Sequence, residues 1–210
     1  MIIQIANIKG GCGKSTLTTN LACLLVNQGK DVIIVDADRQ ATSSNWALDR
    51  NETDKPKVNH VQAFDNIRDT LLDLGKRYEY VLVDAGGRDS RELRTGMTAA
   101  NLLIIPFRPS QPDLDVLPSL QEIITLTKDY NPNLKVRAVL TLAPTNPSVK
   151  EVEEAKDYLK DYQDILLLNT IIRDRKIYRD AMSLGYGVIE MNNDKAIEEI
   201  QQLSEEIHGN

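Results

Sequence analysis

The sequence holds few of the residues from which metal centres, disulfide frameworks and membrane spans are built. Its 210 residues include two cysteines, Cys12 and Cys23, and two histidines. Neither cysteine has a C-x-x-C partner, which argues against a disulfide scaffold, a zinc site and a cysteine-bound iron–sulfur cluster. No apolar run approaches the roughly 20 residues of a membrane-spanning helix. Met1 leads directly into a predicted strand and not into a signal-type segment, so we expect a cytoplasmic protein.

Positive charge is also scarce. Lysine and arginine number 25 against 31 acidic residues, which gives a net charge of −6. Any contact with nucleic acid would therefore need a local basic patch. The acidic segment at residues 196–210 also lacks the basic polar face of a membrane-surface helix, so no membrane contact is expected. The ordinary hydrophobic content of 41% suits a single domain over residues 1–210.

Apolar strands alternate with helices along the chain. This pattern predicts an α/β fold in which a mainly parallel, twisted sheet carries helices on both faces. A first helix should end before Gly29. The other predicted helices are residues 64–78, 117–130, 149–161, 174–184 and 194–207, and the predicted strands are residues 2–8, 32–35, 58–63, 80–84, 102–106, 134–142 and 165–168. Residues 51–57 and the proline-rich residues 107–115 are predicted as loops.

A glycine-rich turn between the first strand and the first helix carries the clearest chemical signal. Its sequence, K-G-G-C-G-K-S-T, has the G-K-[ST] ending of a phosphate-binding loop, with Ile8 where the first glycine of the usual form would stand. Lys14 would contact the β- and γ-phosphates of ATP, and the Ser15 hydroxyl would complete the Mg²⁺ shell. A glycine-rich turn with a solvent-exposed lysine is the alternative. The residues predicted to bind the nucleotide here are Gly10, Gly11, Cys12, Gly13, Lys14, Ser15 and Thr16.

The strand at residues 80–84 ends in Asp84, downstream of this loop. An apolar strand with a terminal aspartate has the form of a Walker B element, in which the carboxylate holds Mg²⁺ through water. A strand-end aspartate can also merely cap the following turn. The phosphate loop upstream favours the metal role for Asp84.

The lysine at the start of the loop resembles the signature lysine of the deviant Walker A motif of the ParA/MinD family of dimerising ATPases. The resemblance implies that Lys9 reaches across a homodimer interface to the partner's ATP, where it would act like an arginine finger. The segment D-A-D-R-Q is similar to the family's D-x-D-P-Q switch motif, with Arg39 in place of proline. This implies that Asp38 positions the attacking water and that Asp36 supports the magnesium shell. An exposed strand-end lysine and an acidic structural turn are the alternatives.

Over essentially its whole length the chain resembles the small, ParF-like plasmid partition ATPases of this family. The resemblance implies a homodimer with ATP that binds DNA without sequence preference and drives partition, associates with the nucleoid when ATP-bound, and is stimulated by a centromere-binding adaptor of the ParB or ParG kind. Pro144 and Asn146 would flank the adenine. The residues predicted to contact DNA are Arg173, Arg175, Lys176 and Arg179.

Two of these interpretations have rivals. Asp174 and Asp180 dilute the basic cluster, so it could instead be a solvated face with i,i+4 ion pairs. A second basic group, Arg88, Arg91 and Arg94, could serve the same surface or the dimer interface. For the function, a cargo-positioning ATPase of the same family uses the same chemistry as a partition ATPase. A P-loop metabolic ligase resembling dethiobiotin synthetase is a further alternative.

Overall fold

The computed structural model describes residues 1–146 and 150–209, and in them seven parallel strands form one sheet. The strand order is β3-β2-β4-β1-β5-β6-β7. Every neighbouring pair is parallel, so the predicted α/β fold with a parallel sheet is confirmed. The strands are β1 (Ile2–Ile5), β2 (Val32–Ala37), β3 (Asn59–Gln62), β4 (Tyr80–Ala85), β5 (Leu102–Phe107), β6 (Lys135–Ala143) and β7 (Leu166–Arg173).

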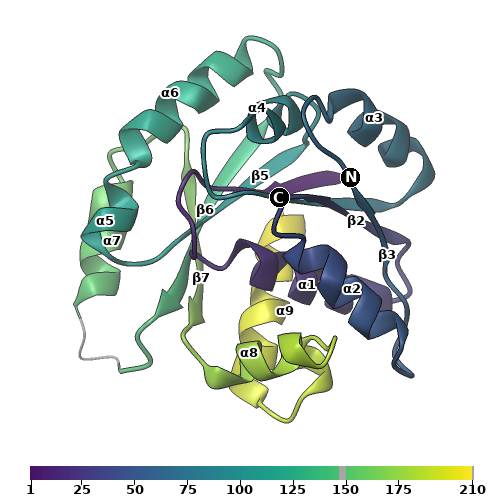
Figure 1. Cartoon of the computed structure of the whole chain (residues 1–210). Coiled ribbons are helices and arrows are strands. Elements are labelled where there is room, and N and C mark those ends of the chain that lie inside the picture. The colour runs from purple at the N-terminus through teal and green to yellow at the C-terminus, as the bar shows by residue number, and fades with distance from the viewer. Residues whose placement is uncertain (147–149, 210) are drawn as a thin grey trace.

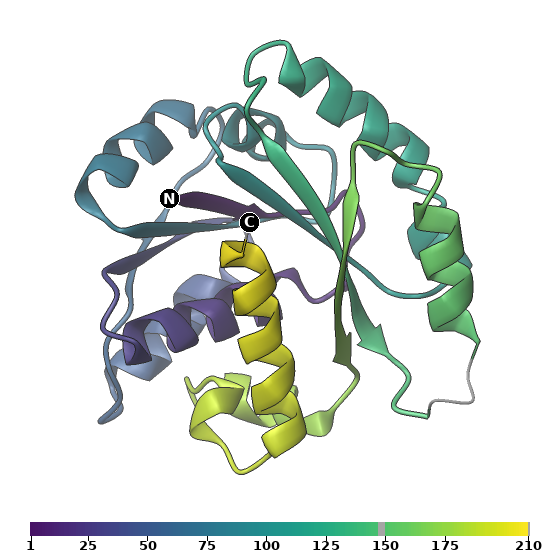
Figure 2. The same cartoon turned by 180° about the vertical axis from the view of Figure 1, so that it is seen from behind.

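Helices cover both faces of this sheet (Figure 1, and from behind in Figure 2). The face packed against one hydrophobic cluster carries α3 (Arg68–Arg77), α4 (Arg91–Met97), α5 (Gln111–Leu114), α6 (Leu117–Lys128) and α7 (Glu151–Leu159). The opposite face carries α1 (Lys14–Asn27), α2 (Thr42–Asn51), α8 (Lys176–Ser183), the 3₁₀ helix η1 (Val188–Glu190) and α9 (Asp194–His208). Within the described residues, no helix combines the length and apolarity needed to cross a bilayer.

The central strands are apolar throughout because side chains on both faces are buried. In β4, for example, Val81 and Val83 pack into one cluster while Leu82 packs into the other. Burial on both faces is typical of parallel sheets and explains the continuous apolar runs in the sequence. Strand β1 lies between β4 and β5, so the direction in which strands are added reverses there. A ligand-binding crevice is expected at the carboxyl ends of the strands beside this point.

Several predicted boundaries were wrong. Strand β1 ends at Ile5 and not at residue 8, because the Asn7 side chain, rather than a strand ladder, donates to Pro106 O at 2.7 Å and accepts from Lys9 N at 3.1 Å. Helix α3 starts four residues later than predicted, after Asp65 with its positive φ of 64°. The predicted start of a helix at residue 149 lies outside the described residues.

Other differences concern whole elements. Helices α2, α4 and α5 and the helix η1 were not predicted. Strand β7 was predicted to end at residue 168, but it continues to Arg173. Arg173 is therefore the last residue of a strand and does not lie at a helix start, and α8 begins only at Lys176.

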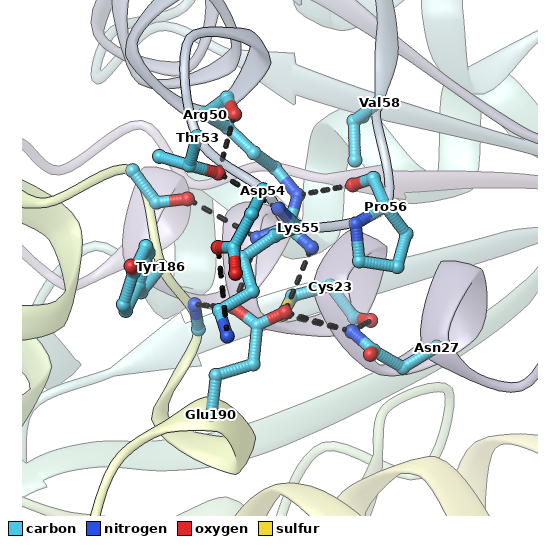
Figure 3. A network of polar contacts seen from close by, with 12 residues as sticks. Cys23, Asn27, Arg50, Thr53, Asp54, Lys55, Pro56, Val58, Tyr186 and Glu190 are labelled. Atoms are coloured by element: carbon cyan, nitrogen blue, oxygen red, sulfur yellow. Dashed lines mark hydrogen bonds and ion pairs between the residues drawn. The ribbon is translucent and has the colours of Figure 1, made fainter.

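Helix α2 is fixed at its C-terminal end by a buried ion pair (Figure 3). The guanidinium of Arg50 donates to both carboxylate oxygens of Glu190, each at 2.9 Å, and the two side chains are 0% and 6% exposed. Arg50 also donates to Pro56 O and Gly185 O, and Asn27 of α1 donates to Glu190. This network joins α1, α2 and η1 and fixes the C-terminal end of α2.

Candidate nucleotide-binding site

The phosphate loop lies at the carboxyl end of β1, in the predicted crevice. Gly11 and Gly13 have positive φ angles of 70° and 89°, and Gly13 directly precedes α1. Left-handed residues alternating with Cys12 give the loop the form of an anion-binding nest at a helix N-terminus. Lys14 is 7% exposed, and its Nζ donates to Lys9 O at 2.8 Å. The ammonium group thus folds back over the loop in the structure.

Two carboxylates lie next to each other beside this loop. Asp36 at the end of β2 and Asp84 at the end of β4 are directly paired in register, and both are buried. Asp36 accepts from Ser44 N at 2.8 Å, and Asp84 accepts from the Ser43 hydroxyl. Both donors belong to the first turn of α2. The position of this helix therefore determines whether the two carboxylates keep their hydrogen bonds.

The electrostatics of Asp84 fit a cation site. Burial raises the pKa of its carboxyl to about 6; hydrogen bonds from Ser43 and Ser15 oppose this, while the charge of Asp36 adds to it. A divalent cation would relieve the repulsion between the two carboxylates. The described residues contain no cluster of three or more acidic, histidine or cysteine side chains suited to hold a metal alone. Two carboxylates and a serine hydroxyl match Mg²⁺, which is usually completed by water and substrate phosphates.

Asp38 faces the same space as the loop. A cavity of about 270 Å³ is lined by residues of the loop and α1, among them Gly11, Lys14 and Ser15, and by Asp38 and Gln40. Asp38 accepts from Gln40 N at 3.0 Å and lies against Gly86, where a Cβ would be 3.4 Å from the carboxylate carbon. The structure therefore brings together the predicted phosphate-binding, magnesium-binding and water-positioning residues.

The segment predicted to flank the adenine follows β6. Pro144 accepts a hydrogen bond from Arg173 Nη1 at 2.7 Å through its carbonyl, and Asn146 lies in the exposed segment two residues beyond it. A small cavity of about 40 Å³ lies between this end of β6 and the start of α1, with Thr16 and Leu142 in its wall. Pro144 and Asn146 as adenine contacts stay a prediction.

Lys9 lies at the start of the phosphate loop. Its backbone N–H and carbonyl are used within the loop, and the residue is half-buried. Among residues 1–146 and 150–209, no carboxylate lies within ion-pair distance of its ammonium group. The same is true of Arg108, whose guanidinium donates to Gly11 O at the outer side of the loop.

The four residues predicted to contact DNA all have protein partners. Arg173 donates to Pro144 O, and Arg175 pairs with Glu199 at 2.8 Å, with side chains 21% and 11% exposed. Lys176 and Arg179 form exposed ion pairs with the two aspartates of this segment, at 2.6 and 2.7 Å. Sequence reasoning foresaw the aspartate pairs but missed Glu199, which comes from α9.

Four residues around the site were missed, three that act through side chains and Ser44, which acts through its backbone N–H. Ser43 and Ser44 could have been found, because hydroxyl residues beside an acidic turn are typical of a helix start. Arg108 and Thr141 carry no local signal: they reach the loop only because β5 and β6 lie next to each other and β5 pairs with β1. Of the second basic group, Arg94 pairs with Asp89 at 2.7 Å, while Arg88 and Arg91 are exposed.

Comparisons with known proteins match the chain to a nucleotide-binding family and to solved structures of the same fold. The family model described as CobQ/CobB/MinD/ParA nucleotide binding domain matches residues 3–206. The chain is 30% identical to the maintenance of carboxysome distribution protein A of Halothiobacillus neapolitanus, over 98% of this chain and 95% of that protein. It is 26% identical to the sporulation initiation inhibitor protein Soj of Bacillus subtilis, over 76% of this chain and 80% of that one. Its fold is similar to that of apo McdA from Cyanothece, with a TM-score of 0.79 and 16% identity over 98% of each chain.

Proposed function

Because the chain belongs to the CobQ/CobB/MinD/ParA nucleotide-binding family and is an ATPase of the ParA/MinD type, we propose that it positions a large intracellular cargo by an ATP-driven cycle of DNA binding and release. The observation that carries the choice of cargo positioning is the similarity, over nearly the full length of both chains, to a protein named for maintaining carboxysome distribution. Plasmid partition, the function favoured by the sequence motifs, becomes the second candidate. A relative from Myxococcus xanthus that is named chromosome partitioning protein ParA keeps it in consideration.

In the proposed cycle the chain binds ATP with Mg²⁺ on the phosphate loop. The inward N–H groups of residues 10–16 hold the phosphates, and Lys14 leaves Lys9 O to contact the β- and γ-phosphates. Ser15, Asp36 and Asp84 would hold Mg²⁺, with Asp84 acting through water, and the cation would neutralise charge on the phosphates. This assignment is supported by the common cavity and by the two adjacent buried carboxylates.

Asp38 orients the attacking water in this proposal. Its carboxylate is half-buried, lines the same cavity as Lys14 and Ser15, and is positioned by the Gln40 N–H. A positioned carboxylate can accept a hydrogen bond from a water molecule. The lone pair of the water oxygen is then directed at the γ-phosphate.

Two chains would join face to face across their nucleotides. Lys9 lies at the mouth of the loop and has no acidic partner among the described residues, so its charge is available to a neighbour. In a homodimer it would stabilise the developing charge on the partner's γ-phosphate. Hydrolysis removes that phosphate and with it the attraction that holds the dimer.

The dimer would bind DNA where the monomer binds only weakly. Each copy presents the exposed cations Lys176 and Arg179 on α8, and two linked pairs of cations bind a polyanion far more tightly than one. Nucleotide state would then control association with the nucleoid. An adaptor protein on the cargo, in the role of a ParB- or ParG-like protein, would stimulate hydrolysis and release. The relatives named for carboxysome distribution, which match this chain over nearly its whole length, favour positioning over the metabolic ligase alternative.

A gel-shift experiment on nonspecific duplex DNA tests this proposal. With Mg²⁺ and ATP the chain should shift the DNA, and with ADP it should not; Lys9→Ala should fail to shift it in either state. Equal binding with both nucleotides, or no binding, would contradict both positioning and partition.

Deletion of the gene in its source cell separates the two candidates. Cargo positioning predicts clustered or mis-spaced cytoplasmic bodies with normal plasmid retention. Loss of a plasmid with normally spaced bodies would favour partition instead.

A further inference from the structure

Two side chains that belong to no motif donate hydrogen bonds to carbonyl groups on the outer side of the phosphate loop. Arg108, directly after β5, donates from Nη2 to Gly11 O. Thr141 on β6 donates from Oγ1 to Cys12 O at 2.7 Å. Two successive carbonyl groups of the loop are therefore held from outside, by residues about 100 and 130 positions away in sequence.

The geometry of the peptide group gives these two bonds a consequence inside the loop. In a planar trans peptide, the C=O and the N–H of the next residue point in opposite directions. Fixing Gly11 O outward turns the Cys12 N–H inward, and fixing Cys12 O does the same for the Gly13 N–H. Gly11 and Gly13, with φ angles of 70° and 89°, supply the left-handed conformations that such an arrangement requires.

We propose that Arg108 and Thr141 are positioning residues that pre-orient the Cys12 and Gly13 N–H groups toward the phosphates of the bound nucleotide. The inference rests on the proposed nucleotide binding at this loop and goes beyond it by assigning the two residues that prepare the loop. Donors already aimed at the charge need no reorganisation when the ligand arrives, so more of the binding energy appears as affinity.

Each residue is suited to this task. Thr141 is 1% exposed, and its single hydroxyl proton goes to Cys12 O at 2.7 Å, the nearer of two carbonyl oxygens, with Phe107 O at 3.2 Å. The Arg108 guanidinium lies against Gly11 itself, where a Cβ would meet Nη2 at 3.1 Å. Asn7 adds a third connection through Pro106 O. The loop is thus held by β6 through Thr141 and by the end of β5 through Arg108, and Asn7, just ahead of the loop, is held through Pro106 O.

Thr141 offers a matched pair of variants. Thr141→Val removes the hydroxyl and keeps the branched shape, whereas Thr141→Ser keeps the hydroxyl. With Mg·ADP as the titrant in calorimetry, we expect Thr141→Val to weaken binding by about five- to tenfold and Thr141→Ser by less than about twofold. Inorganic pyrophosphate, measured by competition, should lose the same factor, because the effect lies in the phosphate contacts.

Arg108 is tested by Arg108→Met and Arg108→Lys. The methionine keeps most of the apolar stem but has no donor, and the lysine keeps a charged ammonium donor on a slightly shorter side chain. We expect the methionine variant to bind both ligands about fivefold more weakly, the lysine variant to recover most of the affinity, and the difference to persist at high salt. A difference that disappears at high salt would show long-range charge and would overturn positioning by Arg108.

Other outcomes separate this inference from its premise. If Lys14→Ala leaves ADP binding intact, the nucleotide site itself is misassigned. If Lys14→Ala abolishes binding while Thr141→Val binds like the wild type, only the present inference fails. It also fails if Thr141→Val lowers the free energy of unfolding in urea without changing affinity for either ligand, since that is the result of a purely structural role. Weaker ADP binding with unchanged pyrophosphate binding would likewise overturn it.

Discussion

The ion pair between Arg50 and Glu190 allows a prediction whose magnitude can be worked out in advance. Burial alone would raise the pKa of Glu190, but hydrogen bonds from Arg50, Asn27 and the Gly187 N–H lower it from 4.5 to about 2. At about 1.4 kcal/mol per pH unit, this fall corresponds to about 3 kcal/mol of stability at neutral pH. Glu190→Gln keeps the shape and removes the charge. It should lower the free energy of unfolding by about 3 kcal/mol, as expected for a buried cation left without its partner.

The sign of the pH dependence follows from the lowered pKa. A carboxyl whose pKa is lower in the folded chain stabilises it fully above 4.5 and loses that contribution as the pH falls toward about 2. The difference between the wild type and Glu190→Gln should therefore shrink from about 3 kcal/mol at pH 7 to about 1.4 kcal/mol at pH 3. Urea unfolding curves of both proteins at the two pH values measure this difference in the free energy of unfolding.

Glu79→Gln is the matched control. Glu79 pairs with Lys30 at 2.8 Å, but their side chains are 46% and 40% exposed. Exposed ion pairs contribute little to stability, so this variant should unfold almost like the wild type at both pH values. A loss at pH 7 as small for Glu190→Gln as for Glu79→Gln, or a loss that stays the same at pH 3, would refute the argument from burial.

Four further predictions concern the candidate site. Lys14→Ala should abolish nucleotide binding in calorimetry, and a variant that still binds ATP normally would contradict the loop assignment. Lys9→Ala should bind ATP yet lose dimer-dependent hydrolysis; a phosphate-release assay that gives the wild-type rate would exclude a role in trans. Asp38→Ala should accumulate the ATP-bound dimer in sedimentation, whereas unchanged turnover would reject water positioning. Gly87→Ala places a Cβ about 2.7 Å from Gly10 Cα, so it should displace the loop and weaken ADP binding in calorimetry by about tenfold or more, and wild-type affinity would contradict this close packing.

The strands and the phosphate loop could be predicted from the sequence because their signals are local. A strand that is buried on both faces appears in the sequence as a continuous apolar run. The glycines and Lys14 of the phosphate loop all lie within eight consecutive residues. Helix α2 could not, since its sequence T-S-S-N-W-A-L-D-R-N has little helical pattern of its own. Its stability comes from tertiary contacts: Trp46 and Arg50 are buried, and Trp46 Nε1 donates to Tyr186 O at 3.1 Å.

The end of β7 was misjudged for a related reason. Asn169 and Thr170 interrupt the apolar run, and as polar residues they look like the end of a strand. In the structure Glu206 of α9 accepts from both of their backbone N–H groups, at 2.8 and 2.7 Å. Strand β7 lies at the edge of the sheet and has no strand on its outer side. A carboxylate 36 positions away accepts the hydrogen bonds that a neighbouring strand would accept, and β7 continues to Arg173. Only the packing of α9 on the sheet reveals it.

The packing of α9 on the sheet separates the predicted DNA-binding residues into two groups. In one group a DNA phosphate could replace the present acidic partner of the cation, and in the other it could not. Glu199 accepts from Arg175, from the Arg173 N–H and from the Tyr178 hydroxyl, so withdrawing Arg175 would leave a buried carboxylate short of a partner. Lys176 and Arg179 are 78% and 66% exposed, and their ion pairs with aspartates lie in water, where exchange of one anion for another costs little. The proposed DNA contact should therefore depend on these two residues of α8, while Arg173 and Arg175 hold the β7–α8 turn in the shape that presents them.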